Sequence, residues 1–217
     1  HWGLLNINML GKNIKVAREQ FETLENLISK ERISDAEEMV QVNMLLNAAL
    51  FLYKEDHSEE TLFNTFHQYE SVLAAGSIHL TRYYIAVALL ISDFDVLNGS
   101  ILPIIKSESY RYSDSFTTFI KALLEDFDYE KAESLISDIE ALCEKDYFLS
   151  QVKDKITQAA KNLILSVYGM VHNQEDVTPF VKKLGKSEED VKTFQHKPLD
   201  YNENESIENR LKDLLSL

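Results

Sequence analysis

Residues 107–173, SESYRYSDSFTTFIKALLEDFDYEKAESLISDIEALCEKDYFLSQVKDKITQAAKNLILSVYGMVHN, set the architecture of this chain. Apolar residues recur in this stretch at i, i+3, i+4, i+7 and i+8, which is the spacing of one face of an amphipathic helix. Three such segments follow one another. Their apolar positions are Phe116, Phe119, Ile120, Leu123 and Leu124 in the first, Ala132, Leu135, Ile136, Ile139, Leu142 and Cys143 in the second, and Val152, Ile156, Ala159, Ala160, Leu163, Val167 and Met170 in the third.

The connection between the first two of these helices is very short. Residues 126–129 leave room only for a tight turn, so the two helices must lie side by side and antiparallel. The third helix is longer and offers its apolar stripe to this hairpin. The stretch therefore predicts a helical hairpin packed on a long helix, and the rest of the chain is expected to stack on that unit.

Composition fits a helical globular protein. The chain has 217 residues, of which 45% are hydrophobic and 27% charged, so it can bury a sizeable core in one large or two small domains. Only three prolines and six glycines occur, which favours long helices. The formal net charge is −14, and such a field repels phosphate backbones. A dedicated nucleic-acid-binding protein is therefore disfavoured.

The cysteine content and the absence of long apolar runs indicate in which cellular compartment the chain is expected to fold. Cys143 is the only cysteine and lies on an apolar helical stripe, so we interpret it as a core residue in a reducing compartment. No apolar run approaches the ~20 residues of a membrane helix. No secretion signal is visible. The chain starts at His1 with helix-like residues, and we expect it to be a piece of a longer protein with helices upstream.

Further helix signals fill the part of the chain before the hairpin. Residues 2–10 and 14–28 predict two amphipathic helices, and Ala17 and Phe21 have the Ala-x-x-x-Phe spacing of tetratricopeptide half-repeats. A similar scheme returns in the hairpin, which suggests a helical solenoid. Ser34 and Glu37 form a capping box that opens the next helix. That helix is apolar nearly all round toward Tyr53, as expected of an interior helix.

Three more helices are predicted before residue 107. One carries apolar residues from position 62 to 73 and stops before Gly76. Ser77 is expected to cap the next helix, which runs to Ser92. The last starts near Asp93 and meets Pro103, which must either kink it or mark its first turn.

After the long helix, the pattern changes. Residues 178–194 predict two short helices around Gly185, which is the helix-turn-helix layout of winged-helix modules. Residues 195–203 are polar and irregular. A final helix presents an apolar stripe that must either fold back onto the chain or join a helical bundle with other subunits. That stripe consists of Ile207, Leu211, Leu214 and Leu215.

No pattern for catalysis or cofactor binding occurs. The chain lacks phosphate-binding glycine loops, the nucleophile elbow and every zinc spacing among its six histidines. The acidic pairs at Glu59 and Glu188 fall in first turns of predicted helices, where carboxylates complement the helix dipole. We therefore predict that the chain is not an enzyme and holds no cofactor or metal. Lys182 and Lys183 form part of a small basic cluster, enough for a peripheral contact at most.

A family resemblance rests on five short segments in a fixed order. The architecture resembles the PCI domain, which the proteasome lid, the signalosome and eukaryotic translation initiation factor 3 share. Within that family, the chain resembles the initiation factor 3 members over roughly residues 1–190. The segments are His1-Trp2-Gly3-Leu4-Leu5 with Lys12-Asn13, Ile78-His79-Leu80-Thr81-Arg82-Tyr83, Glu108-Ser109-Tyr110-Arg111-Tyr112, Phe127-Asp128 before Ala132, and Asp146-Tyr147-Phe148-Leu149.

The resemblance implies a predominantly all-α fold with three parts. Residues 1–146 would form a right-handed helical solenoid of antiparallel helix pairs. Residues 147–195 would form a winged-helix module, and residues 196–217 a linker and a C-terminal bundle helix. The chain departs from the family after Phe194, because residues 195–204 offer no apolar strands. The wing is therefore expected to be reduced or missing.

The same resemblance implies a function. The chain would be a non-catalytic, cytoplasmic scaffold that binds sibling PCI and MPN subunits and the small ribosomal subunit in translation initiation. Any RNA contact would be indirect, and no membrane or small-molecule substrate is implied. One alternative is a PCI subunit of the proteasome lid or signalosome, and another is a helical nucleic-acid-binding regulator. The candidate interaction residues are Ile207, Leu211, Leu214, Leu215, Phe180, Val181, Lys182 and Lys183.

Overall fold

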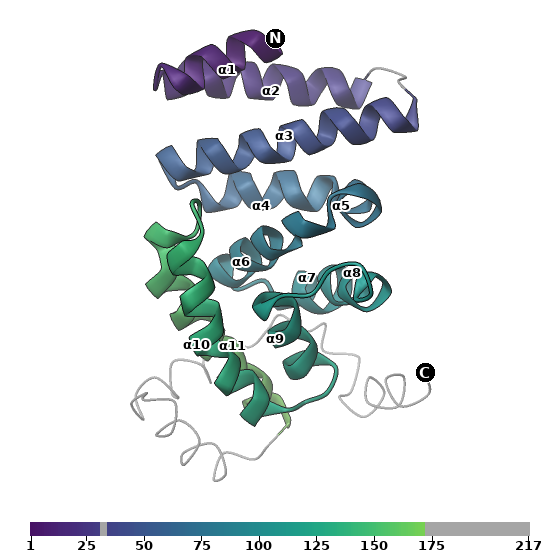
Figure 1. The fold of residues 1–217 in the computed structure, drawn as a ribbon, viewed down its shortest axis with the longest axis vertical. Coiled ribbons are helices and arrows are strands. Elements are labelled where there is room, and N and C mark those ends of the chain that lie inside the picture. The colour runs from purple at the N-terminus through teal and green to yellow at the C-terminus, as the bar shows by residue number, and fades with distance from the viewer. Residues whose placement is uncertain (31–33, 172–217) are drawn as a thin grey trace, which may run out of the picture. The chain divides into compact units, whose positions relative to one another are not determined.

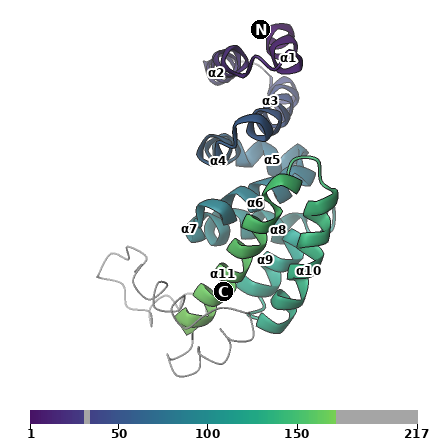
Figure 2. The same ribbon diagram turned by 90° about the vertical axis from the view of Figure 1, so that its left-hand side faces the viewer.

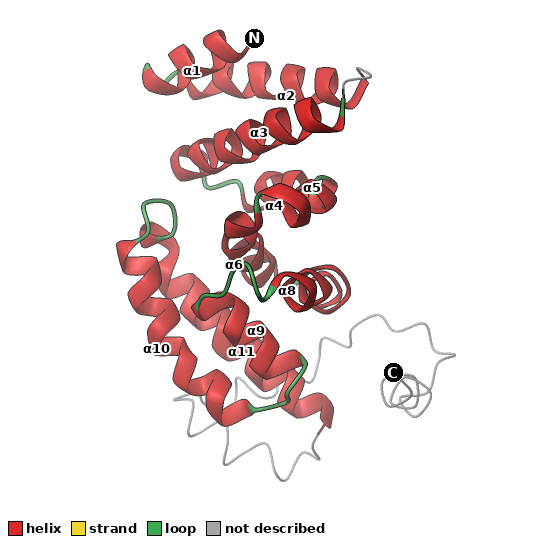
Figure 3. Cartoon of the chain, turned by 45° about the vertical axis from the view of Figure 1, so that its right-hand side comes forward, coloured by secondary structure: helices red, strands yellow, loops and turns green. Residues whose placement is uncertain are grey.

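The computed structural model describes residues 1–30 and 34–171. All regular secondary structure in those ranges is helical, and no strand occurs among them (Figure 3). The predicted, predominantly all-α fold is confirmed. The chain divides into two compact units, His1–Tyr168 and Gly169–Leu217, and almost all of the second lies outside the described residues.

Within the first unit, successive helices stack on one another from α1 onward (Figure 1). Helix α1 packs on α2, α2 on α3 and α3 on α4, whereas α6 contacts both α4 and α9. This order is that of a helical solenoid. The elements are α1 (Trp2–Leu10), α2 (Ile14–Lys30), α3 (Asp35–Asp56), α4 (Glu59–Gln68), α5 (Glu70–Gly76), η1 (Ile78–Leu80), α6 (Thr81–Ile91), α7 (Phe94–Val96), η2 (Leu97–Ile101), α8 (Leu102–Glu108), α9 (Ser115–Leu124), α10 (Tyr129–Lys145), η3 (Ser150–Val152) and α11 (Lys153–Val171).

The predicted hairpin of α9 and α10 is confirmed. The turn reverses through Phe127, whose φ of 52° is in the left-handed region, and the Asp128 amide donates to the Ala122 carbonyl at 2.8 Å. The Asp128 carboxylate then caps α10 by accepting from the Lys131 amide at 3.0 Å. The apolar face of α9 is fully buried. The burial of that face fixes the hairpin against the rest of the unit.

Helix α11 packs on the hairpin, as expected, and runs antiparallel to α10. Tyr129 at the start of α10 meets Tyr168 near the end of α11, with ring centroids 5.0 Å apart. Lys153 at the start of α11 lies 3.5 Å from Glu140, which is near the end of α10. In Figures 1 and 2, α9, α10 and α11 lie together at the end of the unit opposite α1. Met170, placed on the predicted stripe, is exposed instead.

Two of the predicted helices have other boundaries in the structure. The helix expected through residues 62–73 is interrupted at Tyr69, whose φ of −111° and ψ of 25° depart from helical values, so α4 and α5 are separate. Its ring is buried, and the apolar spacing continues across the break. Ser77 does not cap a long helix through its side chain. It precedes the single turn η1, and α6 begins only at Thr81.

The helix around Pro103 follows one of the two expected outcomes. Asp93 caps α7 by accepting from the Val96 amide at 2.9 Å. The five residues of η2 form a π-helical turn, and Pro103 lies in the first turn of α8. A proline has no amide hydrogen, and its ring crowds the carbonyl four residues earlier, here that of Gly99. A wider π turn just before Pro103 relieves both problems.

Helix α3 is correctly opened by its capping box but is not wholly interior. The Glu37 carboxylate accepts from the Ser34 amide at 3.2 Å, and its hydrogen bonds with Ser34 hold the pKa of Glu37 below its usual value. The prediction of an interior helix is wrong on one side, because Met44 and Phe51 are exposed there. The apolar run was correct, but the unit covers only part of the circumference of α3.

We predict that the cap at Asp128 contributes measurably to stability. Asp128→Ala should lower the free energy of unfolding by about 1 kcal/mol, because an amide of α10 loses its acceptor. Urea unfolding followed by far-UV circular dichroism measures the change. Lys131→Ala is the matched control, because its backbone amide is kept, and it should stay within about 0.5 kcal/mol of the parent. Equal effects of the two substitutions would contradict the prediction.

Candidate functional site

Three of the segments that carry the family resemblance meet around one arginine. Arg82 of α6 donates from Nε and Nη2 to the Tyr112 hydroxyl at 2.9 and 2.6 Å. Its guanidinium lies 3.1 Å from Asp114 Oδ2 and 3.6 Å from Asp146 Oδ2. Tyr112 donates to Asp114 at 2.7 Å, and Tyr83 donates to Asp146 at 2.9 Å. We call Arg82, Tyr83, Tyr112, Asp114 and Asp146 the Arg82 cluster.

The charges of this cluster are largely removed from water. The side chains of Asp114 and Asp146 are each 8% exposed, and that of Arg82 is 26% exposed. Buried carboxylates need hydrogen bonds as well as an opposite charge. Asp114 also accepts from the Thr117 amide at 2.9 Å and so caps α9. Asp146 Oδ1 accepts from the Phe148 amide at 2.9 Å. Both carboxylates are therefore well satisfied.

Burial and hydrogen bonding shift the pKa values of the cluster. Burial, followed by the hydrogen bond to Asp114, raises the pKa of Tyr112 to about 12. Burial and the hydrogen bond to Asp146 raise the pKa of Tyr83 even further above its usual value. For Arg82, burial alone would lower the pKa, but Tyr112 and Asp114 outweigh it and raise the pKa. At neutral pH, both phenols are therefore neutral donors beside a permanent cation.

The geometry of the Arg82 cluster is that of a brace. It joins α6 to the segment before α9 and to the segment after α10, three parts of the chain that are far apart in sequence. Helical periodicity and spacing do not predict that these segments meet. A signal was present, because Arg82 is the only charged residue in α6, and a charge in an apolar helix requires a buried partner.

An exposed group of aromatic rings adjoins the brace. Phe148 contacts Phe51, Tyr147 and Tyr83 with ring centroids 5.0, 5.1 and 5.7 Å apart. The Lys54 ammonium lies 2.8 Å from the centre of the Tyr147 ring. Phe51 is 45% and Tyr147 59% exposed. Exposed aromatic rings held in place by a buried network are typical of protein–protein contact surfaces.

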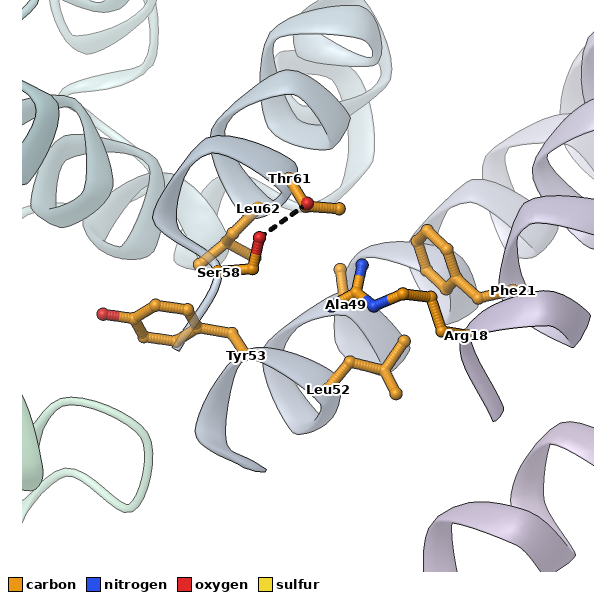
Figure 4. Close-up of a pocket in the computed structure, with 8 residues that line it drawn as sticks. All are labelled: Arg18, Phe21, Ala49, Leu52, Tyr53, Ser58, Thr61 and Leu62. Carbon is orange, nitrogen blue, oxygen red and sulfur yellow. Dashed lines mark hydrogen bonds between the residues drawn. The ribbon is translucent and has the colours of Figure 1, made fainter. Parts of the chain in front are cut away.

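The described residues also form a hollow between α2, α3 and α4 (Figure 4). Only about 10 Å³ of it is free for a water-sized molecule, whereas pockets for small ligands usually have about 300 Å³ or more. Arg18, which lines the hollow, already forms an ion pair with Asp56. The hydroxyl groups of Ser58 and Thr61 are hydrogen-bonded to each other, with their oxygens 2.7 Å apart. The hollow is thus too small and too well paired for a substrate. Its lining residues are Arg18, Phe21, Ala49, Leu52, Tyr53, Ser58, Thr61 and Leu62.

Other candidates for chemistry have structural roles. Cys143 is fully buried, and burial raises the pKa of its thiol to about 12, so it is a core residue as predicted. Glu59 lies in the first turn of α4, and its carboxylate is 3.3 Å from the Lys155 ammonium. In the described ranges, no three His, Cys, Asp or Glu side chains are placed to hold a metal ion. No described helix has the length and apolar character to cross a membrane.

The interaction residues predicted from the sequence remain predictions. All of them fall between residues 172 and 217, outside the described part of the chain. Only the second half of the predicted winged-helix module (147–195), from residue 172 onward, lies in the same region. Those residues are Ile207, Leu211, Leu214, Leu215, Phe180, Val181, Lys182 and Lys183.

We predict that Arg82 is required for stability. Arg82→Ala leaves two nearly buried carboxylates without their cation, which should lower the free energy of unfolding by about 2 to 4 kcal/mol. Arg82→Lys should lie in between, because a lysine cannot form the forked contacts. The control is Arg111→Ala, which removes a more exposed pair with Glu108 and should change stability by less than about 1 kcal/mol. Equal losses for Arg82→Ala and Arg111→Ala, measured by urea unfolding, would refute the role.

The Arg82 cluster also predicts a loss of stability at alkaline pH. The Tyr112 hydroxyl keeps its proton in the folded state up to a pKa of about 12, whereas the unfolded chain releases it near 10. The free energy of unfolding should therefore fall as pH rises through that interval. Tyr112→Phe removes one of the groups responsible and should make the decline shallower in urea unfolding experiments. An identical slope in parent and variant would contradict the assignment.

Comparisons with known proteins agree with the sequence resemblance. No protein-family model matches the chain. The chain is 28% identical over 201 residues to the E subunit of eukaryotic translation initiation factor 3 from Phaeosphaeria nodorum, covering 87% of this chain and 46% of that protein. With the E subunit from Monosiga brevicollis, the identity is 28% over 89% of this chain and 41% of the relative.

A shorter segment is more strongly alike. Over 90 residues, 42% of this chain and 20% of the relative, the identity to the E subunit from Botryotinia fuckeliana is 38%. The chain spans less than half the length of the curated relatives it matches. The resemblance to the initiation factor 3 members of the PCI family, predicted from the sequence, is confirmed. The chain is similar to the E subunit of eukaryotic translation initiation factor 3 over most of its own length.

Proposed function

We propose that this chain is part of a translation initiation factor 3 subunit and acts there as a non-catalytic cytoplasmic scaffold. The observation that carries the proposal is the similarity to relatives named as the E subunit of that factor, over 87% of the chain. The mechanism is binding geometry. A braced stack of helices presents fixed surfaces to sibling PCI and MPN subunits, and through them the assembly contacts the small ribosomal subunit.

The physical character of the chain supports a protein-binding role. Its net charge of −14 opposes direct binding to ribosomal RNA, so contact with the ribosome would occur through proteins or a few local lysines such as Lys182 and Lys183. The half-buried Arg82 cluster supports an exposed aromatic surface through Tyr83, which packs on Phe148. A pre-organised surface lowers the entropic cost of association.

The C-terminal stripe is proposed to anchor the chain in a bundle shared with sibling subunits. Apolar residues at i, i+4, i+7 and i+8 suit a helix that buries one face against others. Phe180 and Val181, with Lys182 and Lys183 beside them, would make a lateral contact in the predicted winged-helix module. The anchor residues are Ile207, Leu211, Leu214 and Leu215.

We predict that Leu211→Asp with Leu215→Asp releases the protein from its complex. Two carboxylates cannot be buried in an apolar bundle, so recovery of sibling subunits by affinity purification should fall about tenfold or more. The thermal unfolding of the helical unit should not change. Asn209→Asp with Ser216→Asp is the matched control, because it adds the same charge at polar positions. Undiminished co-purification of the leucine variant would refute the anchor.

The same purification tests the function itself. Translation initiation factor subunits and ribosomal proteins should dominate the proteins recovered by mass spectrometry. Proteolytic-core or cullin-linked proteins would instead indicate a PCI scaffold of the proteasome lid or signalosome. Tight, steeply salt-dependent binding of isolated RNA would favour a nucleic-acid-binding regulator.

A further inference from the structure

Helix α3 has a solvent-facing side without charge. Val40, Met44, Asn47 and Phe51 follow at i, i+4, i+7 and i+11, so they share one face of the helix. We call these four residues the α3 stripe. Val40 is 60% and Met44 43% exposed, and Phe51 belongs to the exposed aromatic group. From position 39 to position 53, no residue of α3 is charged, although this helix reaches the surface of the unit.

The polar residue of the α3 stripe, Asn47, has hydrogen-bond partners within its own helix. The Asn47 side-chain amide donates to the Asn43 carbonyl at 2.7 Å and lies 3.1 Å from the Asn43 side-chain oxygen. Scattered exposed apolar residues are ordinary on protein surfaces. Exposed apolar residues aligned on consecutive helical turns, with the one polar side chain among them already hydrogen-bonded, are instead typical of a surface that another protein covers.

The two ends of the α3 stripe differ in chemistry. At the N-terminal end, Asp35, Glu37 and Glu38 lie in the first turn of the helix. At the C-terminal end, Lys54 stacks on the Tyr147 ring, and Phe51 packs against Phe148. Glu37 lies three residues before Val40 and seven before Met44, so it shares their face. A complementary partner must therefore be apolar along its length and basic at the end beside Glu37.

We propose that the α3 stripe binds an amphipathic helix of a neighbouring protein subunit. From Val40 to Phe51, the stripe is about 16 Å long, which matches three turns of a partner helix. That helix presents apolar side chains to Met44 and a lysine or arginine to Glu37, and its far end lies on the exposed aromatic rings. The proposal rests on the proposed scaffold function and names one surface and partner chemistry for it.

Other occupants fit the α3 stripe less well. RNA would meet an uncharged face flanked by carboxylates, which repel its phosphates. To bind an anionic lipid surface, a protein needs basic residues around its apolar ones. The N-terminal end of the α3 stripe is acidic instead. A small ligand needs a concave pocket, whereas the stripe is the outer face of a helix. A helix with a basic end satisfies both the apolar and the charged parts of the surface.

The first test removes the apolar surface while keeping helix and net charge. Val40→Glu with Met44→Lys places an i, i+4 pair that favours the helix. The variant is expressed as the full-length protein and purified with its complex. We expect the recovery of one sibling subunit to fall roughly tenfold to a hundredfold, given the apolar area lost from the contact. Ser137→Glu with Ala141→Lys makes the same change on the exposed face of α10 and should leave recovery unaltered.

The second test reads the contact directly. A photoreactive p-benzoylphenylalanine replaces Met44 in the purified complex, and the cross-linked peptides are identified by mass spectrometry. The expected product joins α3 to a segment of another subunit with apolar residues at i and i+4 and a basic residue nearby. Removing the charge with Glu37→Gln, which can still cap the helix at Ser34, should weaken assembly about threefold, and more at low salt.

The outcomes separate this inference from the proposed function. If the chain joins no initiation factor complex, the proposed function itself fails. If the chain joins the complex but Val40→Glu with Met44→Lys assembles normally, the α3 stripe is not a docking surface. Cross-links from position 44 only to this chain, to a second copy of it or to RNA would also overturn the proposal.

Discussion

One guanidinium shared by two nearly buried carboxylates constrains the described part of this molecule. Arg82 stands on α6, whereas Asp114 and Asp146 belong to segments before α9 and after α10. Any movement of these segments that separated the charges would leave a carboxylate desolvated and unpaired, which is costly. Because each carboxylate also accepts backbone amides, the same contact fixes the start of α9 and the turn after α10. The brace thereby sets how the α9–α10 hairpin meets the preceding helices.

The brace is connected to the α3 stripe. Tyr83 donates to Asp146 and also packs its ring on Phe148, so the buried network and the exposed aromatic group share a residue. Phe148 in turn contacts Phe51, which ends the α3 stripe. A network of hydrogen bonds and ion pairs thus supports an exposed apolar surface. Within that network, the phenols of Tyr83 and Tyr112 keep their protons and donate to carboxylates.

Helical periodicity predicted most elements because each depends on short-range spacing. The α9–α10 hairpin, the cap at Ser34 and the long α11 were all foreseeable from such patterns. The break at Tyr69 was not, because the apolar spacing continues through it. For Pro103, the sequence predicted either a kink or a position in the first turn of a helix. It did not predict the π turn that precedes this proline. The Arg82 cluster was missed, since its members lie up to 64 positions apart in the chain (146 minus 82).

By itself, the sequence determined the helical class, the order of the helices and the resemblance to the initiation factor 3 members of the PCI family. Those features follow from local periodicity, capping chemistry and short motifs, which are all written in neighbouring residues. Only the tertiary structure decided that Arg82, Tyr112, Asp114 and Asp146 form one brace, and that the other described residues leave one side of α3 exposed. Both results depend on which faces meet after folding. An apolar helix face has the same sequence periodicity whether its partner lies in the same chain or on another protein. Periodicity alone therefore cannot say which partner covers that face.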